Sequence, residues 1–236
     1  MKEIAIICNL TAGSGQAEKR WEKFQMELGS ASIDYTVHFT EASNHATDLT
    51  KNVINNGVKR IVSFGGDGTL NEVIQGMISP SPGFRGDLEL VVLGAGSSND
   101  FEKTFEKIQG DKIIPIDLVR LDYINFNGES ATRFFVNNSS IGVISQAGDR
   151  FNNVSGLTKA MKRVSVDVES RMKLLGLIPS LYNGNALDKE GTRYFECEWL
   201  ELQTNHDVVI ETDGEIVGHP PARYTIMKHA IRTVIG

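Results

Sequence analysis

Residues 60–72 read RIVSFGGDGTLNE, a short apolar run that passes directly into three glycines, an acid and a hydroxyl before a helical pattern begins. Glycines allow backbone N–H groups to approach a phosphate closely, and the start of the following helix favours an anion. This loop follows a strand, and open α/β sheets bind ligands at the carboxyl ends of their strands. A plain turn in which Asp67 caps the helix is the alternative, but a plain turn does not require the flanking glycines and threonine.

The sequence on both sides of this loop alternates between short apolar runs and helical patterns. Strands are predicted at residues 3–9, 34–39, 60–64 and 88–93, and helices at 16–29, 44–55, from the glycine loop to 76, and near 99. Such alternation is typical of βαβ units with a parallel sheet. We therefore expect an α/β fold whose N-terminal domain is a doubly wound, mostly parallel sheet.

The pattern changes after about residue 115. Strands are predicted at residues 117–121, 123–126, 131–141, 195–203, 208–212 and 223–227, with turn signals at Asn127-Gly128 and Asp213-Gly214. A basic, helix-capable segment spans residues 156–175. The sequence thus predicts two domains, residues 1–115 and a mainly antiparallel β domain at 116–236, with the last strand able to return to the first domain.

The composition excludes several classes of protein. The 236 residues include 24 Lys and Arg against 30 Asp and Glu, a net charge of −6, and 40% are hydrophobic. This is an ordinary globular composition, and it argues against nucleic-acid binding, which needs a basic face. Cys8 and Cys197 have no zinc-type spacing, and Cys8 is expected to be a buried thiol. With no signal-like or membrane-spanning run, the cytoplasm is the expected location.

Two further loops are predicted at the same edge of the sheet. Residues 9–15, NLTAGSG, follow the first strand, and residues 94–101, GAGSSNDF, follow the fourth. Neither is specific alone: the first lacks the lysine of a Walker A loop, and the second could simply cap a helix. Together with the glycine loop they predict a polyphosphate site.

The combination of GGDGTLNEV with a downstream GxSxNDF resembles the catalytic domain of diacylglycerol kinases and their bacterial soluble relatives, a group that includes sphingosine and ceramide kinases. NLTAG, the segment FVNNSSIG at 135–142 and ETDGE at 211–215 are similar to further family segments. The resemblance implies an ATP-dependent lipid kinase that uses Mg²⁺ and phosphorylates a lipid hydroxyl such as that of diacylglycerol.

The resemblance also implies roles for individual residues. Asp67 corresponds to the acid of the magnesium and phosphate network, and Glu215 to the base that accepts the proton of the lipid hydroxyl; the metal ligands themselves are not identified. Ser97 stands where the family usually has threonine. The residues implied to line the ATP site are Asn9, Leu10, Thr11, Ala12, Gly13, Thr40, Gly66, Asp67, Gly68, Thr69, Leu70, Asn71, Glu72 and Ser97.

One departure from the family leaves alternatives open. A Gly-rich strand and a DDG loop that members carry before the DGE turn have no counterpart, so the β-rich lipid-substrate domain is shortened. Alternatives are a nucleotide-binding relic without transfer activity, or an NAD kinase-like enzyme, because GGDGT is shared with NAD kinases. Peripheral membrane contact and a homodimer are left open as further partners.

Overall fold

The computed structural model describes residues 4–30, 33–78, 87–94, 108–142 and 195–235. The segment GAGSSNDF beyond its first glycine, and the predicted helices near 99 and at 156–175, lie outside these ranges. Within them, no helix is both long and apolar enough to cross a membrane.

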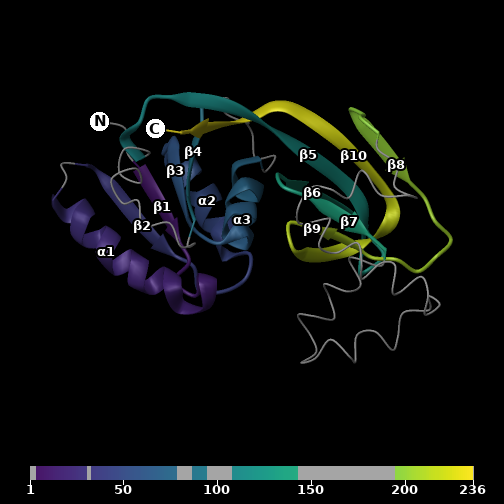
Figure 1. Ribbon diagram of the computed structural model, residues 1–236, viewed down its shortest axis with the longest axis horizontal. Helices are drawn as coiled ribbons and strands as arrows, with labels where there is room; N and C mark the ends of the chain where they lie inside the picture. Colours follow the sequence, from purple (N-terminus) through teal and green to yellow (C-terminus); the bar gives the residue numbers. More distant parts are fainter. Residues whose placement is uncertain (1–3, 31–32, 79–86, 95–107, 143–194, 236) are drawn as a thin grey trace.

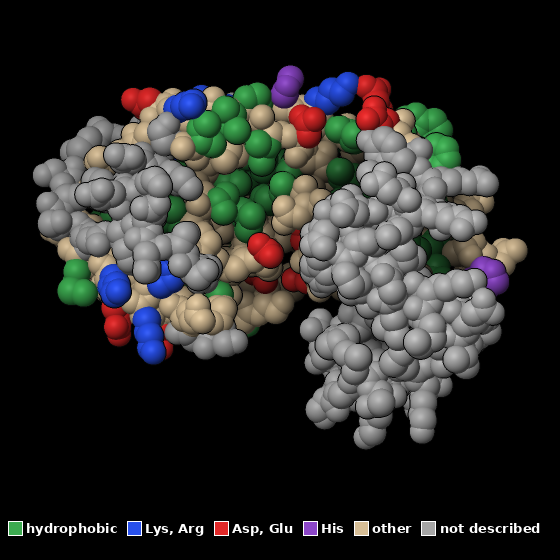
Figure 2. Space-filling view, in the orientation of Figure 1, with side chains coloured by type: hydrophobic (Ala, Val, Ile, Leu, Met, Phe, Trp, Pro, Cys, Tyr) green, Lys and Arg blue, Asp and Glu red, His purple; other side chains and the backbone are tan. Residues whose placement is uncertain are grey.

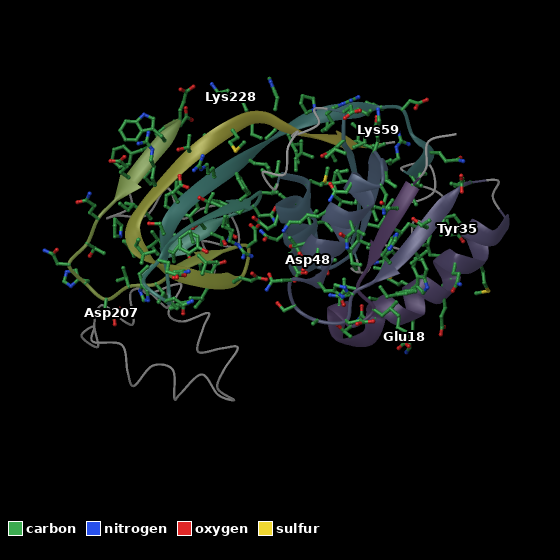
Figure 3. All side chains as sticks on the ribbon, turned by 180° about the vertical axis from the view of Figure 1, so that it is seen from behind. Glu18, Tyr35, Asp48, Lys59, Asp207 and Lys228 are labelled. Atoms are coloured by element: carbon green, nitrogen blue, oxygen red, sulfur yellow. The ribbon has the colours of Figure 1, made fainter. Side chains whose placement is uncertain are left out.

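The N-terminal half is a parallel sheet in the order β2-β1-β3-β4, as the alternating pattern predicts (Figure 1). Its elements are β1 (Ile4–Cys8), η1 (Ala12–Gly15), α1 (Gln16–Ser30), β2 (Tyr35–Phe39), α2 (His45–Asn55), β3 (Arg60–Gly65), α3 (Asp67–Ile78) and β4 (Glu89–Gly94). In Figure 3, Lys59 before β3 and Glu18 in the first turn of α1 mark the amino and carboxyl ends of these strands. The doubly wound prediction is confirmed.

Helices cover both faces of this sheet. On one face Trp21 and Phe24 of α1 pack with Ile6 and Cys8, and on the other α2 and α3 pack against Ile7. Alternate residues of a strand point to opposite faces, so β1 is buried along its whole length. Cys8 is buried as expected, and this burial raises the pKa of its thiol to about 12.

The C-terminal half is antiparallel, also as predicted. It contains β5 (Ile113–Asn125), β6 (Ser130–Phe135), β7 (Ser139–Ile141), β8 (Trp199–Leu202), β9 (Ile210–Thr212) and β10 (Glu215–Val234). Several boundaries differ from the prediction: the strand predicted at 223–227 is part of the longer β10, and β8 and β9 are shorter than the strands predicted at 195–203 and 208–212. The strands at 117–121 and 123–126 form one strand, β5, and the strand at 131–141 is divided because the amides of residues 136–138 bond to the Asp213 carboxylate instead of a neighbouring strand.

Two long strands, β5 and β10, run through both halves and form the arch in Figure 1. β10 is antiparallel to β5 along most of its length, and its end at Arg232 and Thr233 runs parallel to β4. The register of β10 against β5 shifts between Met227 and Ile231. In this bulge His229 has φ 55°, and its N–H donates to Asp117 Oδ1 at 2.7 Å. The division at residue 115 falls within β5, so the two-domain boundary stays a prediction.

A buried ion pair between β3 and β4 gives a prediction about the stability of this sheet. Arg60 Nε donates to Glu89 Oε2 at 2.8 Å, and both side chains are about 95% buried, with exposed fractions of 4% and 5%. Arg60→Met leaves the carboxylate without its main partner, so we expect a loss of about 3–5 kcal/mol in the free energy of unfolding, measured with urea. The double variant Arg60→Met/Glu89→Leu removes both charges and should recover most of that loss. An unchanged stability in the single variant would contradict this.

Candidate functional site

The loop after β1 is hydrogen-bonded to the start of α3. Asn9 Nδ2 donates to Thr69 Oγ1 at 3.0 Å, while Asn9 Oδ1 accepts from the N–H and hydroxyl of Thr11 at 3.0 and 2.8 Å. Asn9 thus shapes its own loop and fixes it beside the glycine loop. These two predicted phosphate loops are brought together at the carboxyl ends of the strands.

The glycines of residues 65–68 stand in different surroundings, so glycine is needed at them for different reasons. A Cβ on Gly65 would lie 2.5 Å from Thr69 Oγ1, so a side chain there would displace the threonine that Asn9 holds. A Cβ on Gly66 would meet, among the described residues, only Ala12 Cβ at 3.9 Å. Gly65 is therefore required by packing, whereas Gly66 borders the space between the two loops. That space is where a phosphate could approach the backbone.

The first residues of α3 carry the charge features of the site. Asp67 is the exposed first residue of this 12-residue helix. The N–H groups of a first helical turn favour an anion, while the Asp67 carboxylate favours a cation beside it. The other predicted residues around the loops are partly buried or exposed: Leu10 and Leu70 pack on the two cores, Gly13 has φ 62°, and Thr40 N donates to Cys8 O at 2.9 Å.

Asn71, predicted to contact nucleotide, has its side chain turned to the β-rich half. Its Nδ2 donates to Asp213 Oδ2 at 3.0 Å and to Phe134 O at 3.3 Å, and its Oδ1 accepts from Arg133 Nη2 at 2.8 Å and Gln75 Nε2 at 3.2 Å. Only 1% of the residue is exposed. All the hydrogen-bonding positions of this amide are occupied, so it connects α3 to the second half of the molecule.

Glu72 also has its carboxylate engaged within the fold. Its two oxygens accept from Asn44 N at 2.8 Å and Ala46 N at 3.0 Å, at the start of α2. A carboxylate there satisfies free amides and interacts well with the helix dipole. The local sequence could not reveal this, because the partners are more than 25 residues away.

The hairpin turn between β9 and β10 brings two acids to the same region. Asp213 and Gly214 both have positive φ, 47° and 87°, as a tight hairpin turn requires. Asp213 accepts from the amides of Val136, Asn137 and Asn138 at 3.1–3.3 Å. These contacts hold the turn against the segment between β6 and β7.

Glu215, the first residue of β10, faces the glycine loop. A Cβ built on Gly68 would lie 3.8 Å from Glu215 Oε1, and the carboxylate side chain is 40% exposed. The turn therefore carries an accessible acid to the start of α3. Figure 2 shows acidic side chains near the centre of the molecule, between its two halves.

Arg133 is the functional candidate that the sequence prediction missed. It lies on β6, and its guanidinium forms an ion pair with Glu215 and a hydrogen bond with Asn71. Nearby, burial raises the pKa of Tyr123, the charge of Glu215 raises it further, and Arg133 opposes the shift. The available signal was a lone charge within ATRFF, a pattern that is common on exposed strands.

Ser97, one of the residues predicted to line the ATP site, lies outside the described residues. Within the described ranges, no cluster of three or more His, Cys, Asp or Glu side chains could hold a metal ion by itself. Mg²⁺ commonly uses one or two carboxylates together with phosphates and waters, and the exposed Asp67 fits that smaller requirement.

Comparison with known proteins gives consistent matches. The family model of the diacylglycerol kinase catalytic domain matches residues 3–123, just over half of the chain. The Bacillus subtilis (strain 168) protein named "Putative lipid kinase YtlR" is 28% identical, covering 85% of this chain and 68% of that protein. The diacylglycerol kinase of Staphylococcus carnosus (strain TM300) is 24% identical, covering 91% of this chain and 60% of that protein.

A solved structure shares the fold. The crystal structure of a diacylglycerol kinase from Bacillus anthracis str. Sterne superposes with a TM-score of 0.66 at 17% identity, covering 100% of this chain and 97% of that one. The curated relatives are longer, since the chain spans 60% of the S. carnosus protein.

The buried amide of Asn71 gives a stability prediction. Asn71→Ala leaves Asp213 and the Phe134 carbonyl without one of their donors, so we expect the free energy of unfolding to fall by about 1–3 kcal/mol. Urea denaturation followed by circular dichroism measures it. Asn52→Ala, on the exposed face of α2, is the matched control and should change stability by less than about 0.5 kcal/mol. Equal effects of the two substitutions would contradict the connecting role of Asn71.

Proposed function

Because the chain belongs to the diacylglycerol kinase catalytic-domain family, we propose that it transfers the γ-phosphate of ATP to the hydroxyl of a lipid such as diacylglycerol. The observation that carries this proposal is the approach of Glu215 Oε1 to Gly68 at the start of α3. It supports a reaction centre between the glycine loop and the β-rich half. Kinase membership is a family property, whereas ATP and the lipid are our proposals for this chain.

The nucleotide would be held mainly by backbone. The loops at residues 9–13 and 66–69 offer N–H groups and hydroxyls, and the start of α3 favours the phosphates. Asp67 would share a Mg²⁺ with them, and the ion supplies neutralisation of the charge that develops during phosphoryl transfer. Asn71 and Glu72 would act indirectly, by fixing α3 against β6 and α2.

Glu215 would act as the general base. As the lipid hydroxyl oxygen bonds to the γ-phosphorus, its proton passes to Glu215 Oε1, and the bond from the γ-phosphorus to the bridging oxygen breaks with its electron pair leaving on ADP. The proton then returns to solvent. In this mechanism the protein accelerates phosphoryl transfer by positioning the reacting groups and neutralising charge, and it forms no covalent bond to the phosphoryl group. The family match and the DGE turn disfavour an NAD kinase-like reaction.

The first test is turnover. We expect ADP and phosphatidic acid from Mg²⁺, ATP and dispersed diacylglycerol, and no product when Mg²⁺ is omitted.

Asp67→Ala should abolish transfer while the circular dichroism spectrum stays unchanged, because the substitution removes one exposed carboxylate. Asp48→Ala on α2, 70% exposed and labelled in Figure 3, is the matched control and should keep full activity. Nucleotide binding without transfer to any of a panel of lipid alcohols would instead support the relic.

Removing the base is the second test. Glu215→Gln keeps the shape of the side chain but cannot take up the proton, so kcat should fall by about 10²–10⁴-fold with little change in the KM for ATP. Glu201→Gln is the matched control, since Glu201 is another acid paired with an arginine, Arg223, on the same sheet. Wild-type kcat in Glu215→Gln would remove Glu215 from the mechanism.

A further inference from the structure

Arg133 is placed unlike the other paired arginines of the β-rich half. Its side chain is 15% exposed, against 50% for Arg120 and 53% for Arg223, which pair with Asp122 and Glu201 on the surface. Exposed pairs of that kind contribute little to stability. Within the described part of the chain, Nε of Arg133 is buried and has no hydrogen-bond partner. The side chain is therefore kept in place despite a cost in desolvation.

One nitrogen of Arg133 joins the two halves at the site. Nη2 donates to Asn71 Oδ1 at 2.8 Å and to Glu215 Oε2. Asn71 lies on α3 and Glu215 opens β10, so the partners are 62 and 82 residues from Arg133 in sequence. Asn71 is itself fixed by Asp213 and Phe134 O. The guanidinium is thereby anchored to a rigid, buried group on one side and to the accessible acid on the other.

The two carboxylate oxygens of Glu215 therefore have different surroundings. Oε2 is held by Arg133, and Oε1 is the oxygen nearest Gly68. A 40% exposed carboxylate without such a partner could rotate among several orientations. The ion pair selects one of them.

We propose that Arg133 is a positioning residue that holds Oε2 of Glu215 so that Oε1 faces the start of α3, where it accepts the proton of the attacking hydroxyl. The inference rests on the proposed function. Arg133 touches neither reacting atom; it acts through Glu215, with Asn71 as its fixed reference point. Correct orientation of a catalytic group is worth a large factor, because a displacement of about 1 Å can cost about 10²-fold in rate.

The test uses steady-state kinetics of the full chain. Arg133→Met should lower kcat by about 10²-fold with the KM for ATP unchanged, and Arg133→Lys, which keeps the charge but not the fork geometry, should lie between Met and wild type. In the background of Glu215→Gln, Arg133→Met should cost almost nothing more, because no base remains to be oriented. Arg223→Met, which removes an exposed arginine from a pair on the same sheet, is the control and should keep wild-type kcat.

Two additional measurements distinguish positioning from a merely structural role. Millimolar guanidinium or methylguanidinium should restore part of the kcat of Arg133→Ala and nothing in Arg133→Ala/Glu215→Gln. Circular dichroism identifies a variant that fails to fold, and Arg133→Lys then takes its place in the double-variant comparison.

The outcomes separate the inference from the function. An inactive wild-type chain would overturn the proposed function, and the positioning role with it. An active wild type whose Arg133 and Glu215 substitutions reduce kcat independently, with multiplying factors and no guanidinium rescue, would overturn the positioning role alone. Non-multiplying losses with rescue would support it.

Discussion

The position of α3 against the β-rich half depends above all on the hydrogen bonds of the Asn71 side chain. It projects from the first turns of α3 into the region where β6 and the β9–β10 hairpin meet, and only 1% of the residue is exposed. Its amide bonds to the Asp213 carboxylate, the Phe134 carbonyl, the Arg133 guanidinium and Gln75. Leaving such a buried amide unpaired costs about 1–3 kcal/mol, so α3 has a strong preference for one position against the β-rich half.

This constraint matters because α3 also begins the candidate site. Asp67 and Gly68 lie on the same helix, four and three residues before Asn71. The orientation of the helix start toward a phosphate and the position of Glu215 opposite Gly68 are consequently set by the same contacts. In the function that we propose, a base and a phosphate must share one geometry, and α3 carries both the glycine beside Glu215 and the helix start that favours an anion.

Backbone pairing also connects the two halves. β5 and β10 pass from one half to the other in a single sheet, and the bulge around His229 lets β10 leave the antiparallel half and join β4 in parallel. Continuous strands alone would allow twisting of one half against the other. The Asn71 contacts, together with the Gln75–Phe134 hydrogen bond, add a second attachment away from the strands.

The sequence by itself determined the local elements. The alternating runs before residue 95 predicted the parallel sheet with its helices, because apolar periodicity is a property of neighbouring residues. Asp213-Gly214 indicated its turn because few residues adopt the positive φ that such a turn requires. The sequence also predicted the loops at residues 9–15 and 65–68, which the fold brings together through Asn9 and Thr69.

Only the tertiary structure decided the use of the polar side chains. Asn71 and Glu72 belong to the motif GGDGTLNE, yet, apart from the bond between Asn71 and Gln75, their side-chain hydrogen bonds go to residues from 26 to 142 positions away. Arg133 has no distinguishing local pattern, because its role comes from two partners that are distant in sequence. Periodicity and turn chemistry act over a few residues, whereas a buried polar group takes whichever partner the packed chain brings within hydrogen-bonding distance.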